Sequence, residues 1–351
     1  MDAFLMQPDD TRRAFFEEAQ ARTALRAESI EKDLWVCLTL RELFSLAEWG
    51  EHLVFKGGTS LSKAWKLIER FSEDIDVVIE RDFLGYAGDS LSQKQIKKLV
   101  KKCSGRIQQN LRPALEARFG RVLRAGMKWS LVPASEQEDK DQQTLLFQYP
   151  TCFPGAAAYV RPAVKIELGA RSDAEPSEIK PIQPYLVELF PGRFGSNEIR
   201  VRTVVARRTF WEKAMLLHEE ILRPAEKKRN PRLSRHYYDL YCLVRRGEGA
   251  RAAGDMALFS RCVQHRAAFF PHPWVDYSKL VPGALHIIPP PEQMTEWQQD
   301  YEAMRQQMFF GEVPTFDEIM KVVGEFEQEF NRSASAASAS PPAPAAGPSS
   351  A

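Results

Sequence analysis

Two carboxylates stand two residues apart in the segment 70–77, Arg-Phe-Ser-Glu-Asp-Ile-Asp-Val. Residues two apart on a β-strand point to the same face, so Asp74 and Asp76 project together while Ile75 and Val77 face a core. Paired carboxylates without nitrogen or sulfur ligands suit Mg²⁺ or Mn²⁺ rather than zinc. The sequence therefore predicts a divalent-metal site at the start of this strand, although an Asp-x-Asp pair by itself is more often a surface or capping feature.

A glycine-containing turn precedes these carboxylates in the segment 56–63, Lys-Gly-Gly-Thr-Ser-Leu-Ser-Lys. It follows a short apolar strand predicted at 53–55 and begins a predicted amphipathic helix. The spacing of Trp65 and Ile68 predicts that this helix continues to about Arg70. Exposed backbone N–H groups and the helix dipole favour a phosphate at such a terminus, although a Gly-Gly turn alone is most often only a turn. A Walker loop is excluded because serine, not glycine, precedes the final lysine.

Together, the turn and the carboxylates are typical of a nucleoside triphosphate held by a metal ion against a helix terminus. The run from Lys56 to Val77 resembles the first motif of the AbiEii/AbiGii toxin nucleotidyltransferases, Lys-Gly-Gly-Thr-x-Leu followed by Arg-x-Ser-x-Asp-x-Asp. These toxins are relatives of the MenT toxins within the polymerase-beta-like nucleotidyltransferase superfamily. The resemblance implies an α/β (α+β) fold, with a nucleotidyltransferase-type mixed sheet flanked by helices and a C-terminal helical lobe.

Three later segments are similar to the remaining motifs of the family, in the same order. Glu167 lies on a predicted strand, and Lys213 follows a glutamate on a helix after a Thr-Val strand. Asp239 lies four residues after Arg235 on a further helix. The resemblance covers roughly residues 30 to 245. Without the first motif, the three segments have plainer interpretations: a solvent-facing strand residue, an ordinary helix lysine, and a helix-surface pair worth about 0.3 kcal/mol.

The resemblance and the needs of nucleotidyl transfer together assign roles, with an NTP as the substrate. Asp74, Asp76 and Glu167 would be the metal ligands, and Glu167 would also help to deprotonate the acceptor hydroxyl. Lys213 would reach the phosphates from the helical lobe, and Asp239 would position Lys213 or the base and ribose. These five residues form the predicted catalytic set. The predicted nucleotide-binding set, in which hydroxyls and backbone N–H groups at 58–60 contact the β- and γ-phosphates, is Lys56, Gly57, Gly58, Thr59, Ser60, Ser72, Lys213 and Asp239.

The stretch 89–128 is helical and strongly basic, with eleven lysines and arginines against two acidic residues. Clustered basic side chains bind nucleic-acid backbones, so this surplus favours RNA over a small molecule as the acceptor. A charge run of this kind is also often a plain solvated helix face. The candidate RNA-binding residues recur at spacings of three and four: Lys94, Lys97, Lys98, Lys101 and Lys102.

The elements that must position these residues divide the chain into two lobes. Periodicity predicts an α/β lobe over 1–200 and a helical lobe over 201–331, in which prolines indicate irregular chain between short helices from 250 onward. A disordered tail of serine, alanine and proline is predicted over 332–351. The net charge of +1 on 351 residues excludes a protein that coats nucleic acid through a uniformly basic surface. With no signal peptide, no membrane-spanning run and no Cys-x-x-Cys pair, we expect a cytoplasmic protein without membrane association.

Three functions are consistent with these observations. The first is the toxin component of a toxin–antitoxin system of the phage-defence type, which moves NMP from an NTP to RNA, at the 3′ end of tRNA, and releases pyrophosphate. The second is the same chemistry on a protein or a small molecule. The third is a non-catalytic RNA-binding module, against which the intact carboxylates argue. The first function implies tRNA and a cognate antitoxin as partners, and we expect an AbiEi-like winged-helix protein encoded nearby.

Overall fold

The computed structural model describes residues 1–23, 25–72, 74–88, 91–155, 161–194, 198–309 and 312–338. Within these residues, seven strands form one mixed sheet in the order β3-β4-β5-β2-β1-β7-β6. Strand β2 is parallel to β5 and β1 is parallel to β7, while the other neighbours are antiparallel. The predicted mixed sheet is confirmed. Its strands are β1 (Leu53–Lys56), β2 (Asp74–Ile79), β3 (Ser130–Pro133), β4 (Thr144–Gln148), β5 (Ala163–Gly169), β6 (Ser177–Ile182) and β7 (Ile199–Val204).

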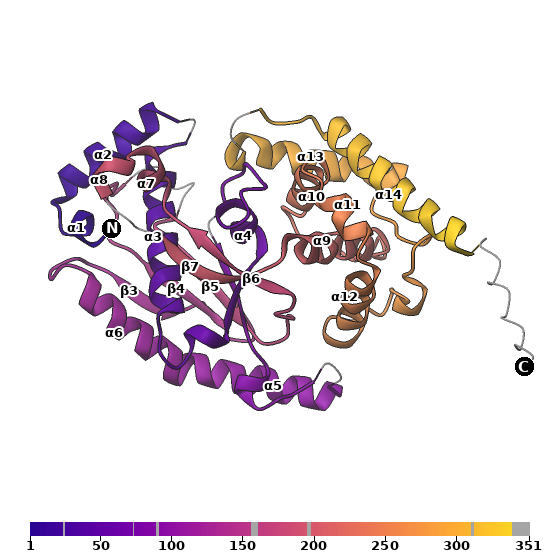
Figure 1. Ribbon diagram of the computed structural model, residues 1–351, viewed down its shortest axis with the longest axis horizontal. Coiled ribbons are helices and arrows are strands. Elements are labelled where there is room, and N and C mark those ends of the chain that lie inside the picture. The colour runs from indigo at the N-terminus through magenta and orange to yellow at the C-terminus, as the bar shows by residue number, and fades with distance from the viewer. Residues whose placement is uncertain are drawn as a thin grey trace, which may run out of the picture.

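One face of the sheet is buried beneath helices of the N-terminal half (Figure 1). Ile75 and Val77 of β2 share an apolar cluster with Leu34, Leu99 and Phe119 of three of these helices. The alternation predicted for β2 therefore holds in the structure. The helices of this half are α1 (Asp2–Leu5), α2 (Asp9–Ala21), α3 (Ala27–Phe44), α4 (Gly57–Lys63), α5 (Gln93–Arg106), α6 (Arg112–Val122), α7 (Tyr185–Leu189) and α8 (Pro191–Phe194), and a π-helical turn at Ile107–Leu111 joins α5 to α6.

The opposite face of the central strands carries charged side chains. The register pairs Lys56 with Asp76 across β1 and β2, and pairs Asp76 with Glu167 across β2 and β5. Paired residues on neighbouring strands point to the same face, and so do residues two apart on one strand. Lys56, Asp74, Asp76 and Glu167 therefore stand on one surface, although they come from three separate segments of the chain.

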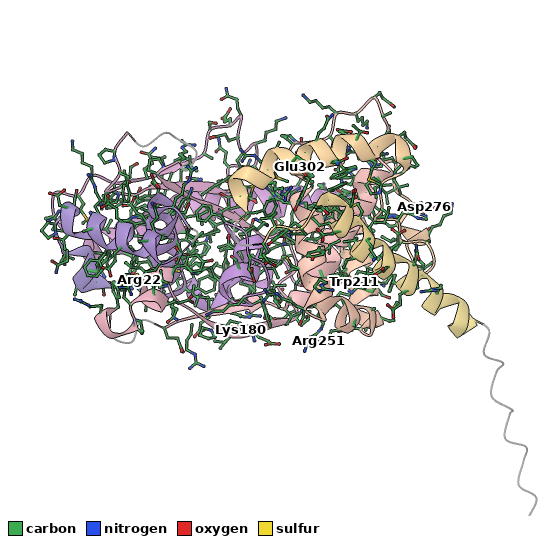
Figure 2. The ribbon with its side chains drawn as sticks, turned by 90° about the horizontal axis from the view of Figure 1, so that it is seen from above. Arg22, Lys180, Trp211, Arg251, Asp276 and Glu302 are labelled. Carbon is green, nitrogen blue, oxygen red and sulfur yellow. The ribbon has the colours of Figure 1, made fainter. Side chains whose placement is uncertain are left out.

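The C-terminal half consists of helices around a second apolar cluster, which lies beside the sheet (Figure 1). Trp211, Tyr237 and Trp297 are buried in this cluster. Figure 2 shows Trp211 among the helices and Asp276 at their periphery. Leu61 belongs to the same cluster, although it precedes the division proposed near residue 200. The helices are α9 (Ala206–Ile221), α10 (Arg235–Arg245), α11 (Glu248–Ala253), α12 (Met256–Phe269), α13 (Pro291–Met308) and α14 (Phe316–Ser338).

Helix α4 ends at Lys63, earlier than the helix predicted to reach Arg70. Lys66 has a left-handed backbone conformation with φ of 53°, which an α-helix does not continue through. The indole N–H of Trp65 donates to the backbone carbonyl of Val204 at 3.0 Å, so this side chain is anchored to β7. The apolar spacing that predicted a longer helix reflects packing against the second cluster instead.

Three other predictions differ from the structure. Strand β6 was not predicted because Ser-Glu-Ile-Lys-Pro-Ile lacks apolar alternation; it is an edge strand, where proline is tolerated. The region from 250 onward contains helices of 14, 18 and 23 residues rather than short ones, and its Pro291 begins α13, where proline is favoured. Helix α14 includes residues 332–338 of the predicted disordered tail, and residues 339–351 lie outside the described residues.

In the described part of the chain, the helices are all too short or too polar to cross a membrane.

Candidate active site

A cavity of about 350 Å³ lies where the charged face of the sheet meets α9 and α10. The carboxylates Asp74, Asp76 and Glu167 line its sheet side, and the cations Lys213 and Arg235 line its helical side. The cavity thus brings together residues of all four predicted motifs. Its lining also includes Lys56, Gly57, Gly58, Arg70, Ser72, Thr209, Glu212, Arg232, His236 and Arg266.

Asp76 and Glu167 oppose each other across β2 and β5. Burial and the negative charge of Glu167 raise the pKa of Asp76 to about 7, while Lys56 acts in the opposite direction. Glu167 also forms an ion pair with Lys165, which lies two residues earlier on the same face of β5. Neighbouring carboxylates that are partly removed from water favour a proton or a cation between them. The electrostatics of this wall therefore favour cation binding.

The donor set of this wall fits Mg²⁺ or Mn²⁺. Its acidic groups are all carboxylates, and these hard cations prefer oxygen atoms as ligands. Mg²⁺ in particular is commonly held by one or two carboxylates together with substrate phosphates. Asp74 and Asp76 are suited to that arrangement. Among the described residues, no three histidine, cysteine or acidic side chains form a ready metal cluster, so the third ligand, Glu167, stays a prediction.

The turn between β1 and α4 requires both of its glycines. Gly57 has a φ of 77°, and a Cβ at this position would lie 2.0 Å from Oδ2 of Asp76. A Cβ on Gly58 would lie 2.5 Å from Nη2 of Arg70. Only glycine therefore lets the backbone pass this closely to the acidic and basic groups of the cavity.

Thr59 and Ser60 are buried and do not line the cavity. The Thr59 hydroxyl forms a hydrogen bond with the Ser72 hydroxyl at 2.8 Å and another with the backbone carbonyl of Asp74. The Ser60 hydroxyl donates to the carbonyl of Gly57 at 2.9 Å. These two hydroxyls hold the turn against β2, so the predicted contact of their hydroxyls with phosphates has no support in their placement.

Asp239 is buried behind the cavity wall, where it binds two cations. The Nε and Nη2 atoms of Arg70 donate to its two oxygens at 2.7 and 2.9 Å, and Nζ of Lys213 lies 2.8 Å from Oδ2. Burial opposes ionisation of Asp239, but Arg70 and Lys213 outweigh it and hold the pKa of the carboxyl well below its ordinary value. Asp239 thus contacts Lys213 directly, and its role in positioning Lys213 stays a prediction.

Glu212 lies beside Lys213 on α9 and binds the lysine of the first motif. Its carboxylate is 2.9 Å from Nζ of Lys56 and 3.2 Å from Nε of Arg208. Burial acts to raise the pKa of Glu212, but Lys56 and Arg208 lower it to about 2. Glu212 and Lys213, adjacent on α9, therefore make separate ion pairs, Glu212 with Lys56 of β1 and with Arg208, and Lys213 with Asp239.

The predicted site residues did not include seven polar residues that line the cavity: Arg70, Thr209, Glu212, Arg232, Arg235, His236 and Arg266. Arg70, Glu212 and Arg235 all lie inside the motif segments, so their position next to the selected residues was an available signal. Thr209 lies outside those segments, and nothing in the sequence marks it.

The five predicted RNA-binding lysines all occupy exposed positions on α5. Only Lys97 and Lys101 of these line a second hollow, of about 760 Å³, between α5 and the end of α12. We call this hollow the basic groove, because its lining also includes Lys140, Arg171 and Arg266. Arg266 lines the active-site cavity as well. Lys94, Lys98 and Lys102 lie outside the groove lining.

The chain matches a known protein family and is similar to solved structures. The family model for the nucleotidyl transferase AbiEii toxin of type IV toxin–antitoxin systems matches residues 38–322. A comparison with curated proteins finds no match. Among solved structures, the chain is similar to JHP933 from Helicobacter pylori, with 13% identity and a TM-score of 0.43 over 90% of this chain and 96% of that chain. It is also similar to the nucleotidyltransferase toxin MenT4 from Mycobacterium tuberculosis, with 18% identity and a TM-score of 0.39 over 93% and 98% of the two chains. Because the family match includes every motif that lines the cavity, the protein belongs to the AbiEii nucleotidyltransferase toxins of type IV toxin–antitoxin systems.

Proposed function

We propose that this toxin is a metal-dependent enzyme that transfers NMP from an NTP to RNA, at the 3′ end of tRNA, and releases pyrophosphate. The observation that carries the proposal is the distribution of charge around the cavity. Three carboxylates line the sheet side, and Lys213 and Arg235 line the helical side. Opposed walls of this kind suit a metal ion and a triphosphate held between them.

In the proposed reaction, the acceptor hydroxyl oxygen forms a bond to the α-phosphorus while the bond from that phosphorus to the bridging oxygen of the β-phosphate breaks. Asp74, Asp76 and Glu167 would hold Mg²⁺ or Mn²⁺, which would supply positive charge to the attacking and leaving oxygens. Glu167 would accept the hydroxyl proton. Lys213 would bind the phosphates that leave as pyrophosphate, and Asp239 would hold Lys213 in place.

The basic groove supports RNA as the acceptor. Its lysines, Lys97, Lys101 and Lys140, provide charge for a phosphate backbone, and Phe270 and His272 in its lining provide rings on which bases can stack. Arg266 lines both the groove and the cavity, so an RNA strand in the groove would lead toward the reacting phosphate. A small-molecule acceptor would make no use of this extended basic surface.

The family implies an antitoxin partner. We propose an AbiEi-like winged-helix protein encoded nearby, and a role in phage defence through arrest of translation. Modification of tRNA would place this activity in the cytoplasm.

The test is incorporation of label from a nucleotide. Purified protein is incubated with total RNA, Mg²⁺ and each α-labelled NTP in turn, with EDTA in a parallel set. We expect one NTP to label RNA of tRNA length, and EDTA to abolish the label. Label on protein or on a small molecule would support the second function instead. RNA binding without label from any NTP would support a non-catalytic module.

A further inference from the structure

Arg235 begins α10 and lines the active-site cavity without a partner. Within the described residues, its guanidinium has no hydrogen bond and no ion pair. Asp239 lies one helical turn further along, where it could pair with Arg235. Both oxygens of Asp239 are instead occupied by Arg70 and Lys213. The helix-surface pair considered from the sequence therefore does not form.

This arrangement gives the helical wall an excess of positive charge. Arg70 and Lys213 share the single carboxylate of Asp239, and Arg235 adds a third cation beside them. A cation that is partly removed from water and has no counter-ion is costly. Burial lowers the pKa of Arg235 and the positive charge of Arg70 lowers it further, while Asp239, Asp74 and Asp76 act in the opposite direction without fully offsetting them. An anion bound in the cavity would relieve this cost.

Thr209 is a second polar group on the same wall without a partner. Its side chain is 2% exposed, and among the described residues its hydroxyl has no hydrogen-bond partner. It lies four residues before Lys213, so both side chains are on one face of α9. Buried hydroxyls nearly always have a partner, and one that lines a cavity can find it in water or in a bound ligand. A ligand with several anionic oxygens would satisfy Thr209 and Arg235 together.

We propose that Arg235 binds the β- and γ-phosphates of the nucleotide and makes the cavity selective for a triphosphate, with Thr209 donating to a phosphate oxygen. The inference rests on the proposed function and deepens it. A guanidinium presents parallel N–H donors that match two phosphate oxygens, which a lysine cannot do. Arg235 and Lys213 would thus both bind the β- and γ-phosphates, which leave as pyrophosphate.

The experiment measures binding of inorganic tripolyphosphate by titration calorimetry in the presence of Mg²⁺. We expect Arg235→Gln to weaken binding by about tenfold to hundredfold, the loss typical of a hydrogen bond to a charged group. Arg235→Lys should recover part of the affinity, and Thr209→Val should weaken binding by a smaller factor. Arg245→Gln, at an exposed position near the other end of α10, is the matched control and should bind like the wild type.

Stability supplies a second readout. Because Arg235 has no ion pair to lose, Arg235→Gln should keep or increase the wild-type melting temperature without ligand, and tripolyphosphate should raise that temperature less than in the wild type. Equal affinity of wild type and Arg235→Gln for tripolyphosphate, or no binding by the wild type, would overturn the inference. Failure of every NTP to label an acceptor would instead overturn the proposed function, because tripolyphosphate binding requires no transfer.

Discussion

Arg70 and Asp239 are separated by 169 residues in the chain, yet two N–H groups of the guanidinium meet the two carboxylate oxygens at 2.7 and 2.9 Å. Both side chains are buried. Arg70 lies just before β2, and Asp239 lies on α10. Their contact therefore joins the helical half to the segment that leads into the strand carrying Asp74 and Asp76.

We expect Asp239→Asn to lower the free energy of unfolding by about 3–5 kcal/mol, because it leaves Arg70 and Lys213 buried without their counter-ion. Urea denaturation followed by circular dichroism measures this change. Asp10→Asn, at an exposed position of α2, is the control and should change stability by less than about 0.5 kcal/mol. A variant as stable as the wild type would show that this contact does not hold the two halves together.

Lys213→Ala should reduce kcat/KM for the NTP by about tenfold to hundredfold, the value of a lost hydrogen bond from a charged donor to phosphate. Lys213→Arg keeps the charge with a different shape, so we expect partial activity. Lys279→Ala, whose side chain is 82% exposed at the periphery, serves as the control. Equal rates for wild type and Lys213→Ala would reduce Lys213 to a structural partner of Asp239.

The ion pair between Lys56 and Glu212 predicts a dependence of stability on pH. The pKa of Glu212 is about 2 in the folded protein and 4.5 ordinarily, so its contribution to stability is complete above pH 4.5 and is lost as the pH falls toward 2. Glu212→Gln removes the titrating group. The stability difference between wild type and Glu212→Gln should therefore shrink by roughly 1 kcal/mol between pH 6 and pH 3.5. A difference that stays constant over this interval would contradict the assigned pair.

The sequence was most informative where local pattern and chemistry coincide. The alternation in β2 places Asp74 and Asp76 on one face, and the structure has that face in the cavity wall. Contacts across the chain could not be read in this way. Nothing in the spacing of Arg70 indicates that it takes both oxygens of Asp239 and leaves Arg235 unpaired. Burial of the Thr59 hydroxyl likewise depends on its tertiary contact with Ser72.

Lysines inside and outside the basic groove can be compared on the same helix, α5, to test whether the groove is the RNA site. Lys97→Glu combined with Lys101→Glu reverses two charges inside the groove, and Lys98→Glu with Lys102→Glu reverses two on the same helix outside its lining. The first pair should weaken RNA binding. It should also reduce the slope of log binding constant against log salt concentration by roughly 0.7–0.9 for each lost phosphate contact. The second pair should have a smaller effect on both quantities.

Filter binding at several salt concentrations measures these slopes, and tripolyphosphate affinity should be the same in both double variants. If the groove variant modifies RNA normally at physiological salt, the groove is not the RNA site, and a protein or small-molecule acceptor gains support.

Nucleotide transfer should depend on the carboxylates of the sheet wall, and Asp76→Ala removes one of them. The substitution leaves the core residues Ile75, Val77 and Ile79 in place and removes a carboxylate whose pKa is raised to about 7 by burial and Glu167, so the variant should fold and melt at or above the wild-type temperature. We expect its rate of label transfer from NTP to RNA to fall by roughly 100-fold or more and its growth inhibition to disappear, as for Asp74→Ala, while Asp10→Ala stays active. A well-folded Asp76→Ala protein that transfers label at the wild-type rate would contradict this account.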